Sequence, residues 1–376
     1  MVKKLRCRLV LLVSLLVLCA AARDIAAEDG SRWLVSPELL EHARLELLWQ
    51  SELPIKKKES LGRLFVLGNR VYALSSRNYM VCLNSEKGNV IFSRPFAPLG
   101  FPVLGLELYE DELISELISV IGGRLIEINA EFGTERDATR VEFGIACPAA
   151  RNSSHFYLSG TDRRMHVLRA EDKVQAFEVA AENDSMITSI VAGEDFVVFG
   201  TDAGNVISIT PDGPKRLWQF DAADSLVGPI VRDGESVFFA SKDTNIYRVD
   251  IVYRANVSTK KLVWKYQTAA VLDKAPRVTG GVVYQYVRYK GLEAIDRKSG
   301  KFMWLVPEGV DLLAESGGKA YVIAKKGKLV VMDNKKAKRL YSVNFARVSR
   351  YVANVADSRI YIADKAGRIA CIKPIE

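Results

Sequence analysis

The sequence predicts an all-β protein, an eight-bladed β-propeller whose blades are four-stranded antiparallel sheets. The first observation is a repeat of strand-like runs that end in an apolar anchor, with the anchors about forty residues apart. The anchors are Leu83, Ile128, Leu168, Ile209, Val249, Ile295, Met332 and Ile372. Eight copies at this period are typical of a propeller or a solenoid.

The second observation is that each copy has the same internal order. A strand-like run precedes a run such as Val283-Tyr284, and a Gly/Asp/Lys turn then leads to the anchored run. A final run ends in an aromatic residue: Trp49, Phe92, Phe143, Phe177, Trp218, Trp264, Trp304 or Tyr341. Alternating runs without helical periodicity predict four strands per copy, and we expect the rings to pack on the neighbouring blade. The second copy fits least well, and we assign a strand pair to 111–123 by position alone.

The third observation is that the two ends of the repeat complement each other. The first aromatic run, at residues 45–49, precedes every complete set of strands, and no such run follows Ile372. If residues 45–49 pair with the C-terminal blade, the ring closes and its exposed edges are covered. An open solenoid would not need complementary ends. We therefore place the propeller at 45–376, after an N-terminal segment (28–44) in which Ser36-Pro37 signals a short helix.

Residues 1–27 have the order of a secretory signal peptide. Lys3, Lys4, Arg6 and Arg8 precede an apolar run that ends at Cys19, and small residues allow cleavage after 22 or 27. The apolar run is too short to span a bilayer. An uncleaved anchor and lipidation of Cys19, which follows Leu18 rather than a small residue, are the alternatives. We expect an exported protein, in the periplasm or associated with the outer membrane.

Composition and cysteine usage exclude several classes of protein. Hydrophobic residues make up 49% and charged residues 26%, which is globular composition, and three histidines are too few for a His-rich metal site. His155 and His166 are expected to be structural. Cys82 and Cys371 hold equivalent positions in neighbouring blades, but packed sheets lie about 10 Å apart and a disulfide needs Cα atoms within about 7 Å. We predict free, buried thiols.

The segment Gly291–Trp304 (GLEAIDRKSGKFMW) resembles the PQQ-like, quinoprotein-type β-propeller repeat, and Lys260–Trp264 is a weaker match. The resemblance extends over residues 45–376. It implies a periplasmic propeller that supports outer-membrane protein assembly, or a PQQ-dependent dehydrogenase. Such dehydrogenases hold the quinone under an adjacent cysteine pair and use calcium ligated by carboxylates, and this sequence has neither a Cys-Cys pair nor a metal-loop spacing. We therefore predict no enzyme, no cofactor, no metal and no catalytic residue.

The turns between the second and third strands of every blade should emerge on one side of the ring. Here they contain twelve Lys and Arg residues and four Asp residues. Such a field steers anionic partners, and Tyr and Arg are enriched at binding hot spots. We predict these partner-binding residues: Arg163, Arg164, Tyr286, Arg288, Tyr289, Lys290, Lys325, Lys326 and Lys328. The alternative is that Lys, Asp and Gly are simply good turn and solubility residues.

These features predict a monomeric, non-catalytic binding scaffold. We expect an acidic protein of the cell envelope as partner, such as an outer-membrane β-barrel assembly component, with peripheral membrane association through anionic headgroups and no nucleic acid. A sensor of an acidic glycan is the remaining alternative. Two long segments, 95–106 and 251–261, depart from the repeat and are further candidates for binding, since long loops on a rigid scaffold often carry it.

Overall fold

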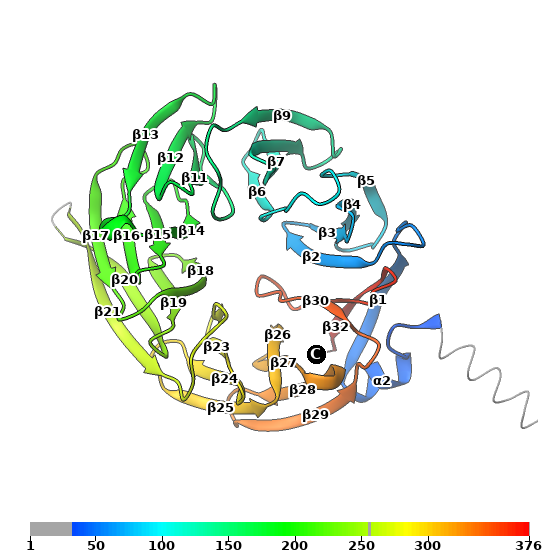
Figure 1. Ribbon diagram of the computed structural model, residues 1–376. Helices are drawn as coiled ribbons and strands as arrows, with labels where there is room; N and C mark the ends of the chain where they lie inside the picture. The colour runs from blue at the N-terminus through cyan, green and yellow to red at the C-terminus, as the bar shows by residue number, and fades with distance from the viewer. Residues whose placement is uncertain (1–31, 255–256, 376) are drawn as a thin grey trace, which may run out of the picture.

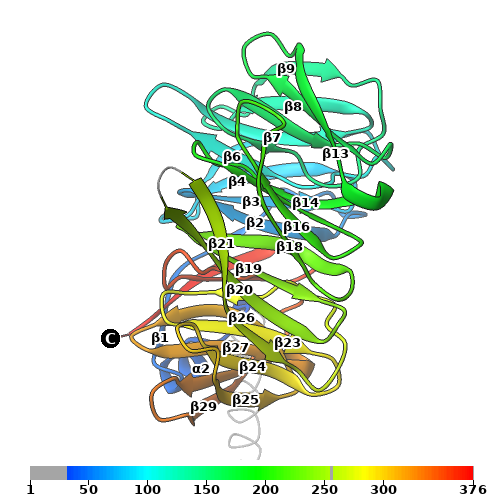
Figure 2. The same cartoon turned by 90° about the vertical axis from the view of Figure 1, so that its left-hand side faces the viewer.

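The computed structural model describes residues 32–254 and 257–375, which form eight four-stranded antiparallel sheets arranged as a ring (Figure 1). The eight-bladed propeller predicted from the repeat is therefore confirmed. The predicted signal peptide and both of its cleavage sites lie outside the described residues. Figure 2 shows the ring from its side, with the outer strand β21 toward the viewer. We refer to the strands of a blade, from the centre outward, as A, B, C and D.

Blades 1 to 4 follow one another along the chain. Their strands are β2 (Leu61–Leu67), β3 (Arg70–Ser75), β4 (Tyr79–Asn84) and β5 (Val90–Pro95); β6 (Glu107–Glu110), β7 (Ser115–Ile121), β8 (Arg124–Asn129) and β9 (Glu135–Arg140); β10 (Ala150–Arg151), β11 (His155–Ser159), β12 (Arg164–Arg169) and β13 (Gln175–Ala180); and β14 (Ile187–Val191), β15 (Val197–Thr201), β16 (Asn205–Ile209) and β17 (Arg216–Asp221).

Blades 5 to 8 complete the ring. Their strands are β18 (Leu226–Asp233), β19 (Ser236–Ser241), β20 (Asn245–Arg254) and β21 (Val257–Gln267); β22 (Arg277–Val278), β23 (Val282–Val287), β24 (Gly291–Asp296) and β25 (Phe302–Pro307); β26 (Gly309–Ser316), β27 (Lys319–Ala324), β28 (Lys328–Asp333) and β29 (Lys338–Asn344); and β30 (Arg350–Val352), β31 (Ile360–Ala363), β32 (Arg368–Pro374) and β1 (Leu45–Glu52).

The ring closes through the first strand of the chain. β1 is the outer strand of blade 8 and pairs antiparallel with β32, so that Leu45 lies opposite Pro374 and Glu52 opposite Arg368. The backbone N–H of Ile375 donates a hydrogen bond to the carbonyl oxygen of Arg44, with an N···O distance of 2.9 Å. The predicted closure is confirmed, and it covers the edge of β32 that would otherwise be exposed.

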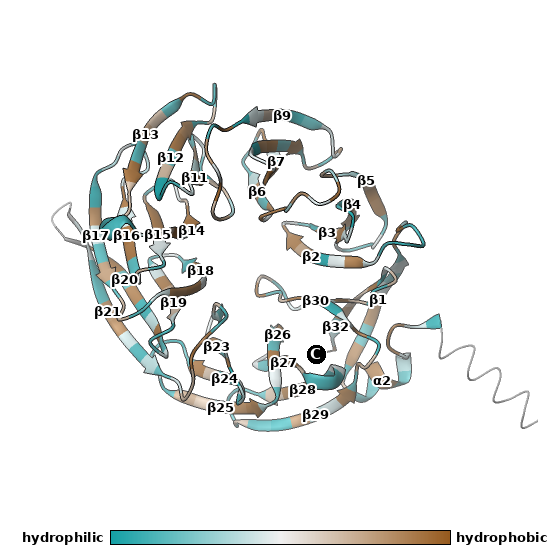
Figure 3. Ribbon diagram, viewed as in Figure 1, coloured by the Kyte–Doolittle hydropathy of each residue, from teal (hydrophilic) through white to brown (hydrophobic). Residues whose placement is uncertain are grey.

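The core lies between neighbouring blades and consists mainly of the B and C strands. All six residues of β3 are buried, because both faces of a blade pack against other blades. A tyrosine recurs at one position of the B strand and is almost fully buried: Tyr72, Tyr157, Tyr284, Tyr321 and Tyr361. The outer strands contact the core with one face only. Figure 3 accordingly shows polar and apolar residues alternating along β21 and β29.

The aromatic residues of the outer strands join each blade to the next, as predicted. The indole Nε1 of Trp49 donates to the Ser85 carbonyl oxygen at 3.0 Å, and that of Trp264 to the Arg297 carbonyl oxygen at 2.9 Å. Trp304 Nε1 donates to Asn334 Oδ1 at 3.1 Å. In each case the acceptor belongs to the following blade. These three indole rings therefore bury their apolar area in the interface and satisfy their polar edge there, whereas the Nε1 of Trp218 is buried without a hydrogen-bond partner.

Blade 2 departs from this pattern, and two predictions for it were wrong. Phe143 lies beyond the end of β9, and Asp137 occupies the register position that the other outer strands give to an aromatic residue. Of the pair predicted at 111–123, only β7 lies there, because its partner β6 precedes it. Asp111 instead forms a turn, in which its Oδ1 accepts from the N–H groups of Leu113 and Ile114 at 2.8 and 2.7 Å.

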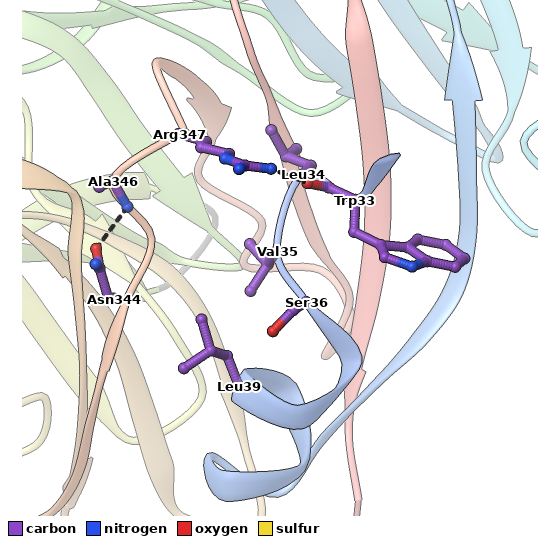
Figure 4. Close-up of a pocket in the computed structure, with 8 residues that line it drawn as sticks. All are labelled: Trp33, Leu34, Val35, Ser36, Leu39, Asn344, Ala346 and Arg347. Carbon is purple, nitrogen blue, oxygen red and sulfur yellow. Dashed lines mark hydrogen bonds between the residues drawn. The ribbon is translucent and has the colours of Figure 1, made fainter. Parts of the chain in front are cut away.

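The segment before β1 is part of the fold. It contains α2 (Pro37–His42), which begins after Ser36, and it buries Leu34, Leu40 and Ala43 against blades 7 and 8. Arg347 Nη1 donates to the Trp33 carbonyl oxygen at 2.9 Å beside a cleft of about 290 Å³, whose lining residues are drawn in Figure 4. Within the described residues, no helix combines the length and the apolar character needed to cross a membrane.

The three cysteines of the described chain, Cys82, Cys147 and Cys371, are free and buried, as predicted for Cys82 and Cys371. Burial raises the pKa of Cys82 and Cys371 to about 12 and that of Cys147 to about 11. Because the thiolate is the reactive form, these thiols are inert packing groups in the folded protein at neutral pH.

Candidate binding face

The topology places two sets of loops on the same side of the ring. Because the strands of a blade are antiparallel, the turn from B to C and the link from D to the next blade leave from the same edge. We refer to this side as the B–C face and to the opposite side as the A–B face. All nine residues predicted to bind a partner lie in or beside the B–C turns of blades 3, 6 and 7. The structure shows how each of them is engaged.

The two arginines of blade 3 are paired with acids of their own surroundings. Arg163 contacts Asp184, which lies in the link that follows β13, and Arg164 contacts Glu178 on β13. The sequence analysis counted the acids of the B–C turns alone, so it missed the acids that the links and outer strands bring to the same face. Blade 3 consequently presents little uncompensated positive charge.

In blade 6, one of the predicted residues is free for contact. Arg288 donates to Asp273 Oδ2 from Nε at 3.2 Å and from Nη2 at 3.1 Å, and Lys290 Nζ lies 3.9 Å from Glu293 Oε1. Tyr286 is half-buried, with Lys274 Nζ 4.4 Å from its ring centroid. Tyr289, by contrast, is 89% exposed and has a φ of 64°. The equivalent turn residues Asn78, Arg163, Thr244 and Lys326 also have positive φ, so this backbone conformation belongs to the turn, and the exposure of the ring is what leaves Tyr289 free for contact.

The lysines of blade 7 carry charge that the described chain does not neutralise. Lys325 and Lys326 lie in a 3₁₀ turn (Lys325–Gly327) and Lys328 begins β28; in the described part of the chain, none of the three forms an ion pair. Glu308 joins this turn to that of blade 6. Its N–H donates to the Lys290 carbonyl oxygen at 3.2 Å, and its carbonyl oxygen accepts from the Lys325 N–H at 2.9 Å.

A cleft of about 440 Å³ lies where blade 6 meets blade 7. Three cations, Lys325, Lys328 and Arg339, and one acid, Glu308, line it, and apolar side chains of the outer strand β25 and of blade 7 complete it. Arg339 also forms no ion pair with a described residue. We refer to this site as the blade 6–7 cleft. The sequence analysis missed Arg339. A bulge in the pairing of β28 with β29 sets Arg339 opposite Met332 and so brings it to this site.

A second cluster of charged residues lies inside the ring, between blades 2 and 3. Arg151 contacts Glu116, and its Nη1 lies 3.7 Å from Glu127 Oε2; Lys173 Nζ lies 2.9 Å from Glu127 Oε1. These charges compensate one another, as buried charges must. Beside them, Glu107 Oε1 accepts from the Arg151 N–H at 3.2 Å. Burial raises the pKa of Glu107 to about 7, although the Arg151 N–H and charge lower it in part.

The side chains present do not fit the quinone and calcium site that a dehydrogenase of this repeat type would need. Among residues 32–254 and 257–375, no group of three or more His, Cys, Asp or Glu side chains could hold a metal ion. His166 Nε2 is bonded to Asp162 Oδ2 at 2.8 Å and its ring stacks on Phe143, and His155 packs against Tyr157.

Comparisons with known proteins agree with the fold. The family model described as outer membrane protein assembly factor BamB matches residues 202–375. The crystal structure of BamB from Moraxella catarrhalis superposes with a TM-score of 0.65 at 13% identity, covering 88% of this chain and 97% of that one. The computationally designed Ika8 protein gives a TM-score of 0.65 at 13% identity, covering 86% of this chain and 98% of its own. At such identities the likeness concerns the fold alone.

The chain is also similar to part of a family of enzymes. It is 29% identical over 138 residues to the dehydrogenase subunit of the quinone alcohol dehydrogenase from Gluconacetobacter polyoxogenes, and 28% identical to that from Acetobacter aceti. The matched part covers 32% of this chain and only 18% of those subunits. Together, the repeat, the closed ring of eight blades and these matches show that the chain is similar to PQQ-like β-propeller repeat proteins.

Proposed function

We propose that this protein is an exported, non-catalytic scaffold of the cell envelope that captures an acidic protein partner at the blade 6–7 cleft. The observation that carries the proposal is the convergence of Lys325, Lys328 and Arg339 on one cleft without an ion pair among the described residues. Because these three cations outnumber the acid of the cleft, Glu308, and form no ion pair with it, their charge is available to steer and hold an anionic surface.

The surroundings of the cleft support a protein rather than a small anion as its ligand. Leu305, Pro307 and Met332 line it and offer apolar contact to a partner's side chain. Tyr289 stands exposed in the neighbouring turn, which Glu308 joins to Lys325. A large exposed ring beside cations is a common composition of a binding hot spot. The family match to an outer-membrane assembly factor and the export signal favour a β-barrel assembly component of the envelope as the partner.

The test compares charge reversal on the two faces of one blade. The double variant K325E/K328E changes the B–C face, and its control K335E/K336E changes two exposed lysines at the turn from β28 to β29 on the A–B face. Both variants alter the net charge equally. We expect the first to bind the purified periplasmic part of the β-barrel assembly component about tenfold or more weakly at low salt, and the control to bind like the unaltered chain.

Quantitative capture on an immobilised chain, repeated over a series of salt concentrations, measures this effect. The unaltered chain should lose affinity as salt rises, and the first variant should show a flatter dependence. Equal capture by all three proteins would contradict the proposal and return these lysines to the role of turn and solubility residues.

The similarity to quinone alcohol dehydrogenase subunits supports a second candidate function, a quinone-dependent oxidation. Incubating the chain with the quinone and calcium, followed by gel filtration, tests it. We expect no chromophore to remain with the protein and no dye-linked alcohol oxidation. A retained chromophore together with turnover would replace the scaffold by the enzyme.

A further inference from the structure

The link between blades 1 and 2 has a composition unlike any other loop of the ring. Its residues, 96–106, read Phe-Ala-Pro-Leu-Gly-Phe-Pro-Val-Leu-Gly-Leu and include neither a charged nor a polar side chain. The link lies on the B–C face, and at its tip Leu99 is 64% exposed and Phe101 46% exposed. Exposed apolar side chains gathered at one loop tip indicate a contact with another apolar phase.

The tip is held in place before any contact is made. Asn78 Nδ2 donates to the carbonyl oxygens of Pro98 at 3.0 Å and Phe101 at 2.8 Å, and the Asn78 carbonyl oxygen accepts from the Phe96 N–H at 2.8 Å. The ring of Phe101 also lies on Gly122, where an added Cβ would stand 2.4 Å from it. Because the link is preformed, docking costs little conformational entropy.

The loops that flank this tip on the same face expose two acids, Glu52 and Glu142, and a larger number of cations. None of these cations forms an ion pair with another described residue: Lys56, Lys57, Lys58, Arg77, Arg124 and Arg140. The loops that carry them are contiguous, since the Ser76 N–H donates to the Ser60 carbonyl oxygen at 2.7 Å. The acid among the lysines, Glu59, is half-buried and accepts from Ser75 Oγ at 2.7 Å.

We propose that this sector of the B–C face docks on an anionic lipid bilayer. Leu99 and Phe101 enter the boundary between headgroups and acyl chains, and the flanking lysines and arginines bind headgroup phosphates. An apolar tip with cations in the flanking loops matches the two layers of such a surface, since basic side chains are attracted to the headgroups and buried apolar area adds to this attraction.

The A–B face also exposes a leucine and a phenylalanine, but the residues next to them in the sequence are acidic. Leu113 is 92% exposed and Phe132 is 69% exposed, and both lie on the A–B face of blade 2. Their sequence neighbours are acidic: Asp111, Glu112 and Glu131. An anionic bilayer repels this face, so apolar exposure alone does not lead to docking there. The pair therefore provides a control that removes more exposed apolar surface than the substitution of Leu99 and Phe101 does.

Sedimentation with vesicles tests the proposal on the chain lacking residues 1–27, so that neither the signal sequence nor an acyl group at Cys19 contributes. We expect binding to phosphatidylglycerol-containing vesicles, little binding to pure phosphatidylcholine, and a loss of about tenfold or more in L99S/F101S and in K56E/K57E/K58E. The control L113S/F132S should bind like the unaltered chain. A matched far-UV circular dichroism melt verifies that each variant is folded.

Tryptophan fluorescence measures independently whether the tip inserts into the vesicle membrane. F101W should shift to the blue in anionic vesicles, and F132W should not. Equal binding of both vesicle types, or equal losses in the two apolar pairs, would overturn the proposal. If L99S/F101S instead abolished capture of the protein partner in the absence of lipid and left vesicle binding intact, the sector would be a protein interface. The vesicle assay contains no protein partner and the capture assay no lipid, so the two proposals fail separately.

Discussion

At the scale of single residues, the ring depends on a contact between an outer-strand ring and a glycine of the next blade. A Cβ on Gly88 would stand 2.3 Å from Trp49, and one on Gly300 would stand 2.6 Å from Trp264. Both glycines also have positive φ, of 70° each. The glycine of the repeat therefore serves two purposes, because it permits the left-handed turn and leaves space for the indole ring.

The Gly88 contact can be isolated with a matched substitution. Gly88→Ala should lower the free energy of unfolding by about 2 to 4 kcal/mol, because it combines left-handed strain with displacement of Trp49. Gly234→Ala introduces the strain alone, since Gly234 has a φ of 60° and nothing within 4 Å of the added Cβ, and should cost about 1 kcal/mol. Urea denaturation measures both. Equal losses would show that the Trp49 contact contributes no stability.

Glu107 predicts a pH dependence of stability. Its pKa in the folded protein is raised from 4.5 to about 7, chiefly by burial, so the charged form is disfavoured by folding. The contribution of this group is full at acidic pH and is lost as pH rises from about 4.5 through about 7. Glu107→Gln keeps an acceptor for the Arg151 N–H and should stabilise the protein by about 1 to 3 kcal/mol at pH 8, with no gain at pH 4.5.

Unfolding in urea at the two pH values measures this effect. Glu112→Gln, which removes an exposed carboxylate from the turn after β6, is the control and should change stability at neither pH. A gain in Glu107→Gln of the same size at both pH values would contradict the assignment of the pH dependence to Glu107.

At the scale of elements, β1 determines whether the ring is closed. It covers the edge of β32 and places Trp49 on blade 1. A chain that begins at Leu53 leaves that edge free, so we expect a lower thermal midpoint and association that increases with protein concentration. A chain that begins at Leu45 retains β1 and loses only the cover formed by Leu34 and Leu40. It should melt earlier than the longer chain and remain monomeric.

Light scattering during gel filtration and a thermal scan distinguish these outcomes. If the chain that begins at Leu53 stayed monomeric with an unchanged midpoint, blade 8 would be stable as three strands, and closure by β1 would not hold the ring together.

At the scale of the whole molecule, two binding sectors share one face. The blade 6–7 cleft and the link between blades 1 and 2 lie on opposite sides of the ring, as the positions of β25 and β5 in Figure 1 show. Both sectors carry cations without ion pairs in the described chain. If the link between blades 1 and 2 rests on a bilayer, the blade 6–7 cleft, on the same face of the ring, stays close to the membrane surface. The two proposals together describe a scaffold that holds an envelope protein at the membrane.

The sequence predicted the ring better than it predicted the site, for a physical reason. Burial by neighbouring blades acts on every repeat in the same way, so the anchors, the aromatic rings and the closing strand recur at a readable period. Charge compensation follows no period. Arg163 and Arg288 looked free in the sequence, yet Asp184 and Asp273 reach them from links that only the folded face brings close.

The linear chain thus determined by itself the number of blades, their four strands and the seam where the ends meet, because alternation, turns and complementary ends are local patterns. Only the tertiary structure decided which charges remain uncompensated and which apolar side chains stay exposed. Both depend on distances between loops that are far apart in the sequence. Blade 2 shows where prediction from the sequence ends. That Asp137 takes the position of the aromatic residue became visible only from the register of β8 with β9.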